Sequence, residues 1–147
     1  MDLKDLIYRE ILPADIPKLL DLWRISGLSI RPKGRDRIEK IAKELENDFE
    51  ALIGAFQKED LVAFILATHD GRKGWINRLA VHPDFRRKGL ATKMIKQAEK
   101  FLESNQIEIY TCLIEDWNKG SIKLFSDLGY KRHDDIIYFS KRLNPDV

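Results

Sequence analysis

The residues best suited to chemistry stand together in the stretch "HPDFRRKGLA" (82–91), between a strand-like run and a helix-like run. Three consecutive cations, Arg86–Lys88, are followed there by Gly89. The first turn of a helix carries free backbone N–H groups and the positive end of the helix dipole, which cations usually avoid. Cations at this end make sense if an anion normally occupies the site. Because Gly89 and the small Ala91 keep the amides accessible, the stretch indicates a site for a diphosphate-type ligand.

A tight turn on a solvated surface is the alternative interpretation of this stretch. Neither common phosphate-binding fingerprint, G-x-x-x-x-G-K-[ST] or G-x-G-x-x-G, occurs in the chain. From the turn alone, both interpretations stay open.

Other reactive side chains give weaker signals. His69, His82 and His133 are far apart and lack the spacing of metal ligands, so no metal site is expected. The single cysteine, Cys112, excludes an intramolecular disulfide and is expected to pack as a small apolar residue in a strand.

The composition indicates the kind of domain that positions these residues. With 147 residues, 44% hydrophobic and 34% charged, the chain fits one globular domain spanning 1–147. A net charge of +2 is too mild to imply nucleic acid. The longest apolar run, 61–67, is too short to cross a bilayer, and the first ten residues do not resemble a signal peptide. We expect a cytoplasmic protein that binds neither membranes nor nucleic acid.

Hydrophobic periodicity predicts alternating strands and helices. The expected strands are 6–11, 51–56, 61–67, 75–81, 107–114 and 136–141, and the expected helices run from Pro13 to Gly27, over 38–45, over 90–102 and over 122–128. The order β-α-α-β-β-β-α-β-α-β predicts a mixed α/β sheet with helices packed on it.

The segment "INRLAVHPDFRRKGLATKMIKQAEKFL" (76–102) resembles the coenzyme A-binding core of the GNAT acetyltransferase superfamily. That core is a strand ending in L-A-V, followed by R/Q-x-x-G-x-G/A at the start of a long helix. A second signature, an asparagine opening a short helix that ends in L-G-[FY], is matched by "EDWNKGSIKLFSDLGYKR" (115–132). The likeness covers essentially the whole chain. From "LLDLWRISGL" (19–28), the chain is most similar to small YpeA-like members.

The resemblance implies a GNAT-like mixed, mostly antiparallel central sheet with a V-shaped splay, flanked by about four helices. It also implies acetyl-CoA as cosubstrate, without a metal, with the pantetheine arm lying in the splay like an added strand. The positions carried over as cofactor-binding are Leu79, Ala80, Val81, Arg86, Arg87, Lys88, Gly89, Leu90, Ala91, Thr92, Asn118 and Lys123.

Each of these positions has an implied role. Main-chain groups of Leu79 and Val81 would pair with the pantetheine arm, and the Val81 N–H would also face the thioester carbonyl. The amides of 87–92 would bind the pyrophosphate, with Arg86 and Lys88 as candidates for the nucleotide's phosphates. Asn118 would contact the cofactor arm, cap its helix, or do both. Lys123 would reach the nucleotide end.

The implied reaction is direct acetyl transfer from acetyl-CoA to a neutral amine. Many family members use a tyrosine seven residues after the asparagine as general acid, and this position is Phe125 here. Tyr130 and Tyr138 are alternative donors. Glu115 and Asp116, which follow an expected strand, are the best carboxylates for a general base, and they fit a solvated turn equally well.

We therefore predict an acetyl-CoA-dependent N-acetyltransferase that acts on a primary amine of a small molecule or peptide. The alternative, motivated by Phe125, is a non-catalytic CoA-binding or regulatory module. The basic loop Arg31–Arg37 either favours an acidic or phosphorylated acceptor or is simply solvated. The final expected strand, within "DDIIYFSKRL" (134–143), could pair with another chain, so a homodimer is a further expectation.

Overall fold

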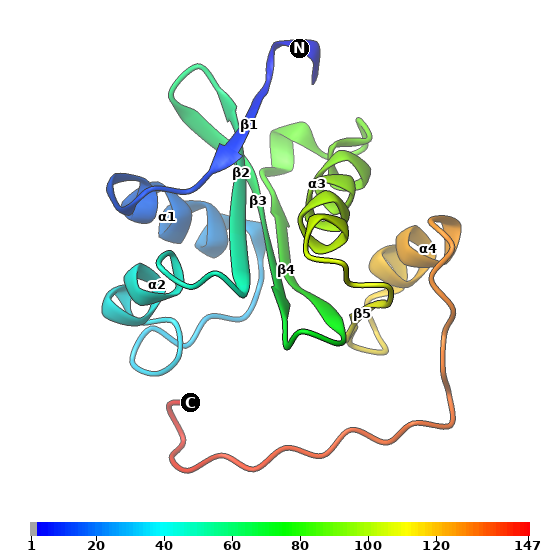
Figure 1. Ribbon diagram of the computed structural model, residues 1–147. Coiled ribbons are helices and arrows are strands. Elements are labelled where there is room, and N and C mark those ends of the chain that lie inside the picture. The colour runs from blue at the N-terminus through cyan, green and yellow to red at the C-terminus, as the bar shows by residue number, and fades with distance from the viewer. Residues whose placement is uncertain (1–2) are drawn as a thin grey trace.

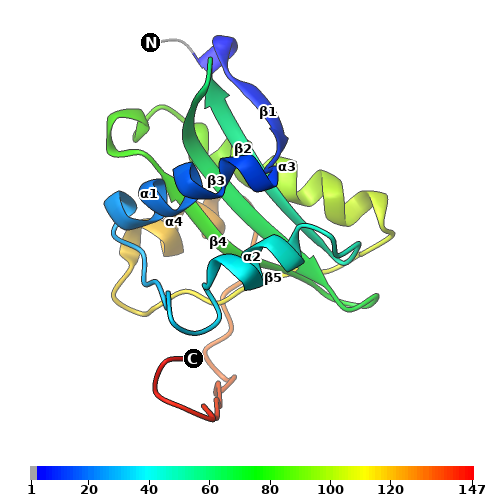
Figure 2. The ribbon, with the colours of Figure 1, turned by 90° about the vertical axis from the view of Figure 1, so that its left-hand side faces the viewer.

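A five-stranded sheet forms the centre of the molecule, in a computed structural model that describes residues 3–147. Its strands, in spatial order, are β1 (Ile7–Glu10), β2 (Glu50–Gln57), β3 (Asp60–His69), β4 (Gly74–Val81) and β5 (Tyr110–Cys112). The helices are α1 (Ile16–Ser26), α2 (Ile38–Glu44), α3 (Leu90–Ser104) and α4 (Lys119–Asp127), with short 3-10 turns at Leu3–Asp5, Pro13–Asp15 and Pro83–Phe85. Helices α1 and α2 cover one face of the sheet (Figure 2), and α3 and α4 lie on the other (Figure 1). No helix within residues 3–147 is long and apolar enough to cross a membrane.

The strand pairing produces a sheet that opens between β4 and β5. Neighbouring strands from β1 to β4 are antiparallel, whereas β4 and β5 are parallel. The parallel pairing runs only from Gly74–Tyr110 to Ile76–Cys112, although β4 continues to Val81. The second half of β4 therefore has no strand beside it on that side. This arrangement confirms the expected mixed, mostly antiparallel sheet with a splay and four helices.

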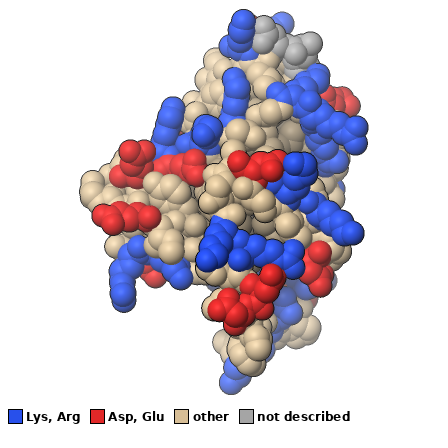
Figure 3. All heavy atoms as spheres, turned by 90° about the vertical axis from the view of Figure 1, so that its right-hand side faces the viewer, with Lys and Arg blue, Asp and Glu red and all other residues tan. Residues whose placement is uncertain are grey.

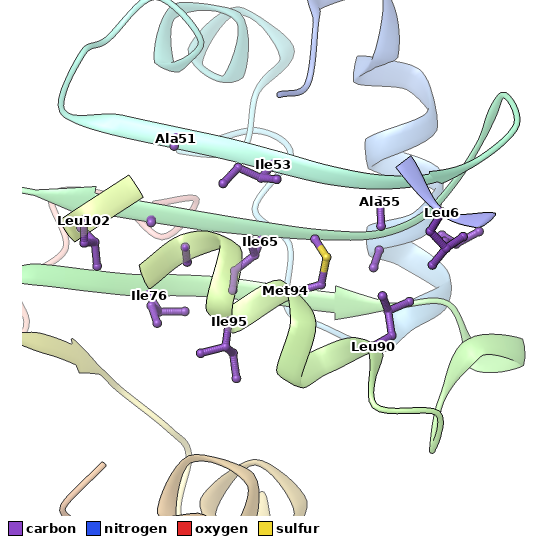
Figure 4. Packing of buried hydrophobic residues seen from close by; sticks show 14 of the residues in the cluster. Leu6, Ala51, Ile53, Ala55, Ile65, Ile76, Leu90, Met94, Ile95 and Leu102 are labelled. Atoms are coloured by element: carbon purple, nitrogen blue, oxygen red, sulfur yellow. The ribbon is translucent and has the colours of Figure 1, made fainter. Parts of the chain in front are cut away.

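Helix α3 fixes the sheet on one side through a single apolar stripe. Leu90, Met94, Ile95, Ala98 and Leu102 recur at helical spacing, and each is at most 1% exposed. They belong to one buried cluster with residues of β2, β3 and β4, and Figure 4 shows Met94 and Leu90 beside Ile65 and Ala55 of these strands. Burial of one such side chain stabilises the fold by about 1.5–3 kcal/mol, so this stripe holds the start of α3 firmly beside the end of β4.

The two faces of β3 serve two separate apolar clusters. Ala63, Ile65 and Ala67 pack toward α3, while Phe64 and Leu66 pack toward α1 and α2. A strand that is covered on both faces has a continuous run of apolar residues in its sequence, and residues 61–67 form such a run.

The final strand predicted at 136–141 is not formed, and this prediction was wrong. After α4 the chain continues as a C-terminal arm (131–147) without helix or strand. In Figures 1 and 2 this arm runs below the body of the molecule, away from the sheet. The residues have the composition of a strand, but a strand forms only when its backbone finds a partner strand. The other predicted elements are present, with β5 shorter than expected.

Candidate functional site

A pocket of about 240 Å³ lies where β4 ends and α3 begins. Its lining consists of Val81, Phe85, Arg86, Arg87, Gly89, Leu90, Ala91, Thr92 and Leu124. Most of the positions predicted from the sequence for cofactor binding are therefore brought together around one space. Phe85 and Leu124 were not predicted. Leu124 comes from α4, whose apolar period gave no sign that it would reach this pocket.

The backbone at the start of α3 leaves several N–H groups without an acceptor. Gly89 is the N-cap of α3 with φ 81°, and Arg87 is also left-handed with φ 61°. Within the described residues, the backbone N–H groups of 87–92 have no acceptor, and Lys93 is the first to donate, to the Gly89 carbonyl at 3.2 Å. A Cβ atom at Gly89 would meet nothing within 4 Å. Unpaired amides at a helix N-terminus, in front of open space, fit a phosphate group.

The three cations of this stretch have different surroundings. The Arg86 guanidinium donates from Nη2 to the Ser26 carbonyl at 2.9 Å and from Nε to the Val81 carbonyl at 3.3 Å. It thereby ties the end of β4 to the C-terminal end of α1, where a cation is favourable. The Lys88 ammonium lies 5.9 Å from the ring centre of Phe85, and the exposed Arg87 makes no ion pair with any residue of 3–147. Arg87 and Lys88 are thus the cations available to a ligand.

Lysine and arginine also gather more widely around this part of the molecule. On the face that carries α3 and α4, Figure 3 shows them toward the upper end, where α3 begins, while acidic side chains mix with them lower down. On this face, lysine and arginine are therefore densest toward the end where α3 begins.

The open edge of β4 presents alternate main-chain groups to the splay. The His82 N–H donates to the Val62 carbonyl at 2.8 Å. Hydrogen-bonded pairs alternate along antiparallel strands, so Ala80, opposite Phe64, turns its N–H and C=O toward β3. Leu79 and Val81 turn theirs the other way, into the splay. The backbone groups of Leu79 and the N–H of Val81 are consequently available there, whereas the Val81 carbonyl accepts from Arg86 and the groups of Ala80 are used by the sheet.

Asn118, the N-cap of α4, and Lys123 in α4 do not line the pocket. Leu79, Ala80 and Lys88 do not line it either. The Asn118 side-chain oxygen accepts the Ser121 N–H at 3.2 Å, so Asn118 caps α4. The Lys123 ammonium donates to Asp127 at 2.8 Å, and this hydrogen bond raises the pKa of Lys123. Both side chains have partners of their own within the helix.

The two carboxylates predicted as general bases are exposed in the turn before α4. Glu115 accepts the indole N–H of Trp117 at 3.1 Å, and Asp116 has no such partner in the part of the chain described. Both carboxylates therefore lie in a solvated turn, which was the alternative expected from the sequence.

At position 125, where the resemblance would place a tyrosine as general acid, the structure has a ring in the core. Phe125 is 7% exposed and packs edge-on against Tyr130, with ring centres 5.0 Å apart. The Tyr130 hydroxyl donates to Glu99 at 2.8 Å. Burial, followed by this hydrogen bond, raises the pKa of Tyr130, so its proton is both engaged and weakly acidic. Tyr138 lies on the exposed arm.

A buried ion pair on the opposite face of β4 was missed by sequence reasoning. The Arg78 guanidinium donates to Asp36 at 2.9 Å and lies 4.7 Å from the ring centre of Trp23. Asp36 is 2% exposed and also accepts the Arg31 N–H at 2.6 Å. These contacts fasten the loop between α1 and α2 to the middle of β4. The only sequence signal was a single acid within the basic run 31–37.

Two further carboxylates near this pair have raised pKa values. Burial raises the pKa of Glu44 and of Glu50, and Glu50 also raises that of Glu44 through charge repulsion. One Glu50 oxygen is buried without a hydrogen-bond partner within residues 3–147. Glu50 lies opposite Thr68, whose hydroxyl accepts the Asn77 amide at 2.8 Å. This end of the α1–α2 face is therefore polar and acidic.

Metal binding and thiol chemistry have little support in the structure. Across residues 3–147, no group of three or more histidine, cysteine or carboxylate side chains is placed to hold a metal. Cys112 is half-buried against the α3 cluster, and burial raises the pKa of its thiol to about 11. The thiol therefore stays protonated, and unreactive, near neutral pH.

Comparison with known proteins agrees with this geometry. The sequence profile described as the acetyltransferase (GNAT) family matches residues 16–130. A protein named as an acetyltransferase from Photorhabdus laumondii is 30% identical over 130 residues, covering 88% of this chain and 90% of its own length. Another from Sodalis glossinidius is 27% identical over 132 residues, covering 90% and 92%.

Solved structures share the fold at low sequence identity. The PaiA N-acetyltransferase of Thermoplasma acidophilum, in complex with coenzyme A, superposes with a TM-score of 0.78 at 19% identity and covers 88% of this chain and 91% of its own. The aminoglycoside N-acetyltransferase AAC(6')-Iy, with a bisubstrate analogue, gives 0.76 at 17% identity and covers 93% and 98%. With the family profile spanning most of the sequence and the fold in agreement, the chain belongs to the GNAT family of acetyltransferases, whose acyl donor is acetyl-CoA.

Proposed function

We propose that this protein transfers an acetyl group from acetyl-CoA directly to a primary amine of a small molecule or peptide. The observation that carries the proposal is the row of unpaired amides at 87–92, beside the unpaired edge of β4. One feature binds phosphate and the other binds an extended chain. Coenzyme A contains both a pyrophosphate and an extended amide-containing arm. Within the family we assign the chain to the small YpeA-like members, on the residues of 19–28.

Each part of the pocket has a specific task in this proposal. The amides of 87–92 hold the pyrophosphate, and Arg87 and Lys88 neutralise the nucleotide's charge. Leu79 donates and accepts main-chain hydrogen bonds along the splay, and Val81 contributes its N–H there. The Val81 N–H points to the same side and stabilises the oxyanion that develops at the thioester carbon. Arg86 acts indirectly, since it holds the end of β4 against α1.

The reaction does not require a tyrosine at position 125. The departing group is a thiolate, and a thiol has a reference pKa of about 8.5, so it is a tolerable leaving group near neutral pH. Loss of a positioned acid typically costs about 10²–10⁴ in rate, while orientation and oxyanion stabilisation persist. We retain Glu115 and Asp116 as the candidates that take the proton from the amine. Because both are exposed, either can pass it directly to water.

The acceptor class is best approached through amines that family members are known to modify. The neighbour AAC(6')-Iy was solved with an acetylneamine bisubstrate analogue, so aminoglycosides are the first compounds to test, followed by peptides with free N-terminal or lysine amines.

The test has two stages. First, the melting temperature is measured with acetyl-CoA, CoA and 3′-dephospho-CoA, because a ligand that binds only the folded state raises it. A saturable rise that is lost in Gly89→Glu supports the cofactor site, and no rise with folded protein contradicts it. Second, free thiol is followed during an amine screen. Amine-dependent thiol release supports an enzyme, whereas binding without release with every amine favours the non-catalytic CoA-binding module.

A further inference from the structure

A second pocket, of about 180 Å³, lies at the edge of the sheet where β2 begins. Strand β1 ends at Glu10, opposite Ile53, and the Ile11 N–H donates to the Leu52 carbonyl at 2.9 Å. Before Leu52, β2 has no strand on this side within residues 3–147. The turn after α2 and Phe101 of α3 contribute the lining from the two faces of the sheet. We call this space the β2-edge pocket.

The β2-edge pocket carries negative charge that the described chain does not neutralise. Its acidic lining residues are Glu10, Glu44, Asp48 and Glu50. None of them forms an ion pair with a residue of 3–147, and one Glu50 oxygen is buried there without a hydrogen-bond donor. Arg78 acts electrostatically on Glu44 and Glu50, but its guanidinium is bound to Asp36. Unpaired carboxylates in a partly buried site are costly, and a bound cation offsets that cost.

The main chain adds a further hydrogen-bond acceptor to the pocket. The Phe49 carbonyl accepts the His69 N–H at 2.9 Å, so Phe49 turns its backbone groups toward β3. Because this direction alternates along a strand, Glu50 turns its carbonyl outward, to the open edge. The Glu50 N–H on that edge is already used, since it donates to the Asn47 carbonyl at 3.2 Å. A site made almost entirely of acceptors matches an ammonium group, which has only donors.

The remaining lining shows which kind of cation fits. Ile11, Leu45, Leu52 and Phe101 give the pocket an apolar wall. Within residues 3–147 no three carboxylates are placed to hold one metal ion, so a single metal ion does not satisfy these acids. Positive charges spaced along a methylene chain do, and the methylenes can lie on the apolar wall. The volume equals that of about six water molecules, which is room for a short unbranched chain.

The β2-edge pocket is distant from the proposed site of acetyl transfer. Glu50 lies opposite Thr68, and Thr68 lies opposite Trp75 near the start of β4. Val81 is at the other end of β4, roughly 20 Å away at about 3.3 Å per residue. An amine held beside Glu50 is therefore too far from Val81 to be acetylated while it is bound there.

We propose that the β2-edge pocket binds a short unbranched diamine or polyamine. One ammonium group pairs with Glu44 and Glu50, a second pairs with Glu10 or Asp48, and the methylenes between them contact the apolar wall. The bound amine thereby links the end of β1, the start of β2 and the turn after α2. This site is separate from acetyl transfer, so the proposal stands or falls independently of the proposed enzyme activity.

The first experiment measures the melting temperature without acetyl-CoA, with 1,4-diaminobutane or spermidine as probe. A saturable rise is expected, because a ligand that binds only the folded state stabilises it. n-Butylamine, which has one charge, and Mg²⁺ should give no such rise at the same ionic strength. No rise with either probe, or an equal rise with Mg²⁺, overturns the proposal, since the latter would mean charge screening alone.

The second experiment locates the bound amine by isothermal titration with spermidine. Glu44→Gln and Glu50→Gln each remove one charge-assisted contact and should raise Kd at least about tenfold. Glu46→Gln is the matched control, because Glu46 is exposed, lies two positions from Glu44 and does not line the pocket. Circular dichroism and the melting temperature without ligand check that each variant is folded. Unchanged binding in both pocket variants, or an equal loss in Glu46→Gln, overturns the proposal.

Discussion

Gly89 allows the cofactor-site argument to be tested with a very small change. Its φ of 81° is left-handed, so an alanine there carries a backbone cost of roughly 1–2 kcal/mol. No steric cost is added, because a Cβ would meet no atom within 4 Å. At about 2–4 °C of melting temperature per kcal/mol for a domain of this size, Gly89→Ala should melt about 2–8 °C below the wild type.

The same substitution should weaken cofactor binding in addition to its effect on the fold. The new methyl group projects into the open space in front of the amides of 87–92, where the pyrophosphate is expected. At a concentration a hundred times its Kd, acetyl-CoA should stabilise the wild type by about 2.7 kcal/mol. If the methyl group raises Kd tenfold or more, at least about 1.3 kcal/mol of this gain is lost. The measurement is a thermal-shift titration with acetyl-CoA.

Gly71 provides a matched control. It lies in the turn between β3 and β4, has φ 86°, and also has nothing within 4 Å of a Cβ position. Gly71→Ala should therefore destabilise the unliganded protein to a similar extent and keep the full acetyl-CoA shift. Equal ligand shifts in the two variants, measured at equal acetyl-CoA concentration, would refute the idea that the start of α3 binds the pyrophosphate.

Three further predictions concern side chains away from the pocket. Asp36→Ala leaves the Arg78 guanidinium without its carboxylate and should lower the free energy of unfolding by about 3 kcal/mol, measured by urea denaturation. Tyr130→Phe removes one hydrogen bond to Glu99 and should cost about 1 kcal/mol, with kcat nearly unchanged. Glu50→Gln should raise the melting temperature at neutral pH, because burial raises the pKa of Glu50 and its ionised form destabilises the fold.

The predictions for Asp36→Ala and Tyr130→Phe can each be contradicted by a specific result. Asp21→Ala, which removes an exposed pair with Arg24, should change stability by less than about 0.5 kcal/mol; a loss equal to that of Asp36→Ala would contradict the role of burial. A fall in kcat of about 100-fold or more in Tyr130→Phe would instead identify a general acid.

The pH dependence of Glu50→Gln has a definite sign. A carboxyl with a raised pKa binds more protons in the folded state, so its contribution to stability is lost as pH rises from the ordinary glutamate range through the raised pKa. The gain from Gln should appear only above this window and vanish below it. A gain that is independent of pH would mean that packing, not charge, is responsible.

The sequence alone determined the order of the elements from β1 to α4 and located the turn that we propose binds phosphate. The stripe of α3 and the continuous apolar run of β3 depend on residue spacing along a single element, which can be read directly from the chain. The same is true of Gly89, because one residue at one junction supplies the left-handed cap and the open approach to the amides.

Only the tertiary structure decided which side chains have partners and which do not. Arg78 meets Asp36 and Arg86 meets the Ser26 carbonyl across 42 and 60 positions of sequence, distances over which spacing patterns carry no information. The raised pKa of Glu50 likewise arises from burial by distant elements. The absence of a strand in the C-terminal arm could not be predicted from its residues either. These residues favour a strand, but strand formation depends on a second backbone, which the arm's own sequence does not supply.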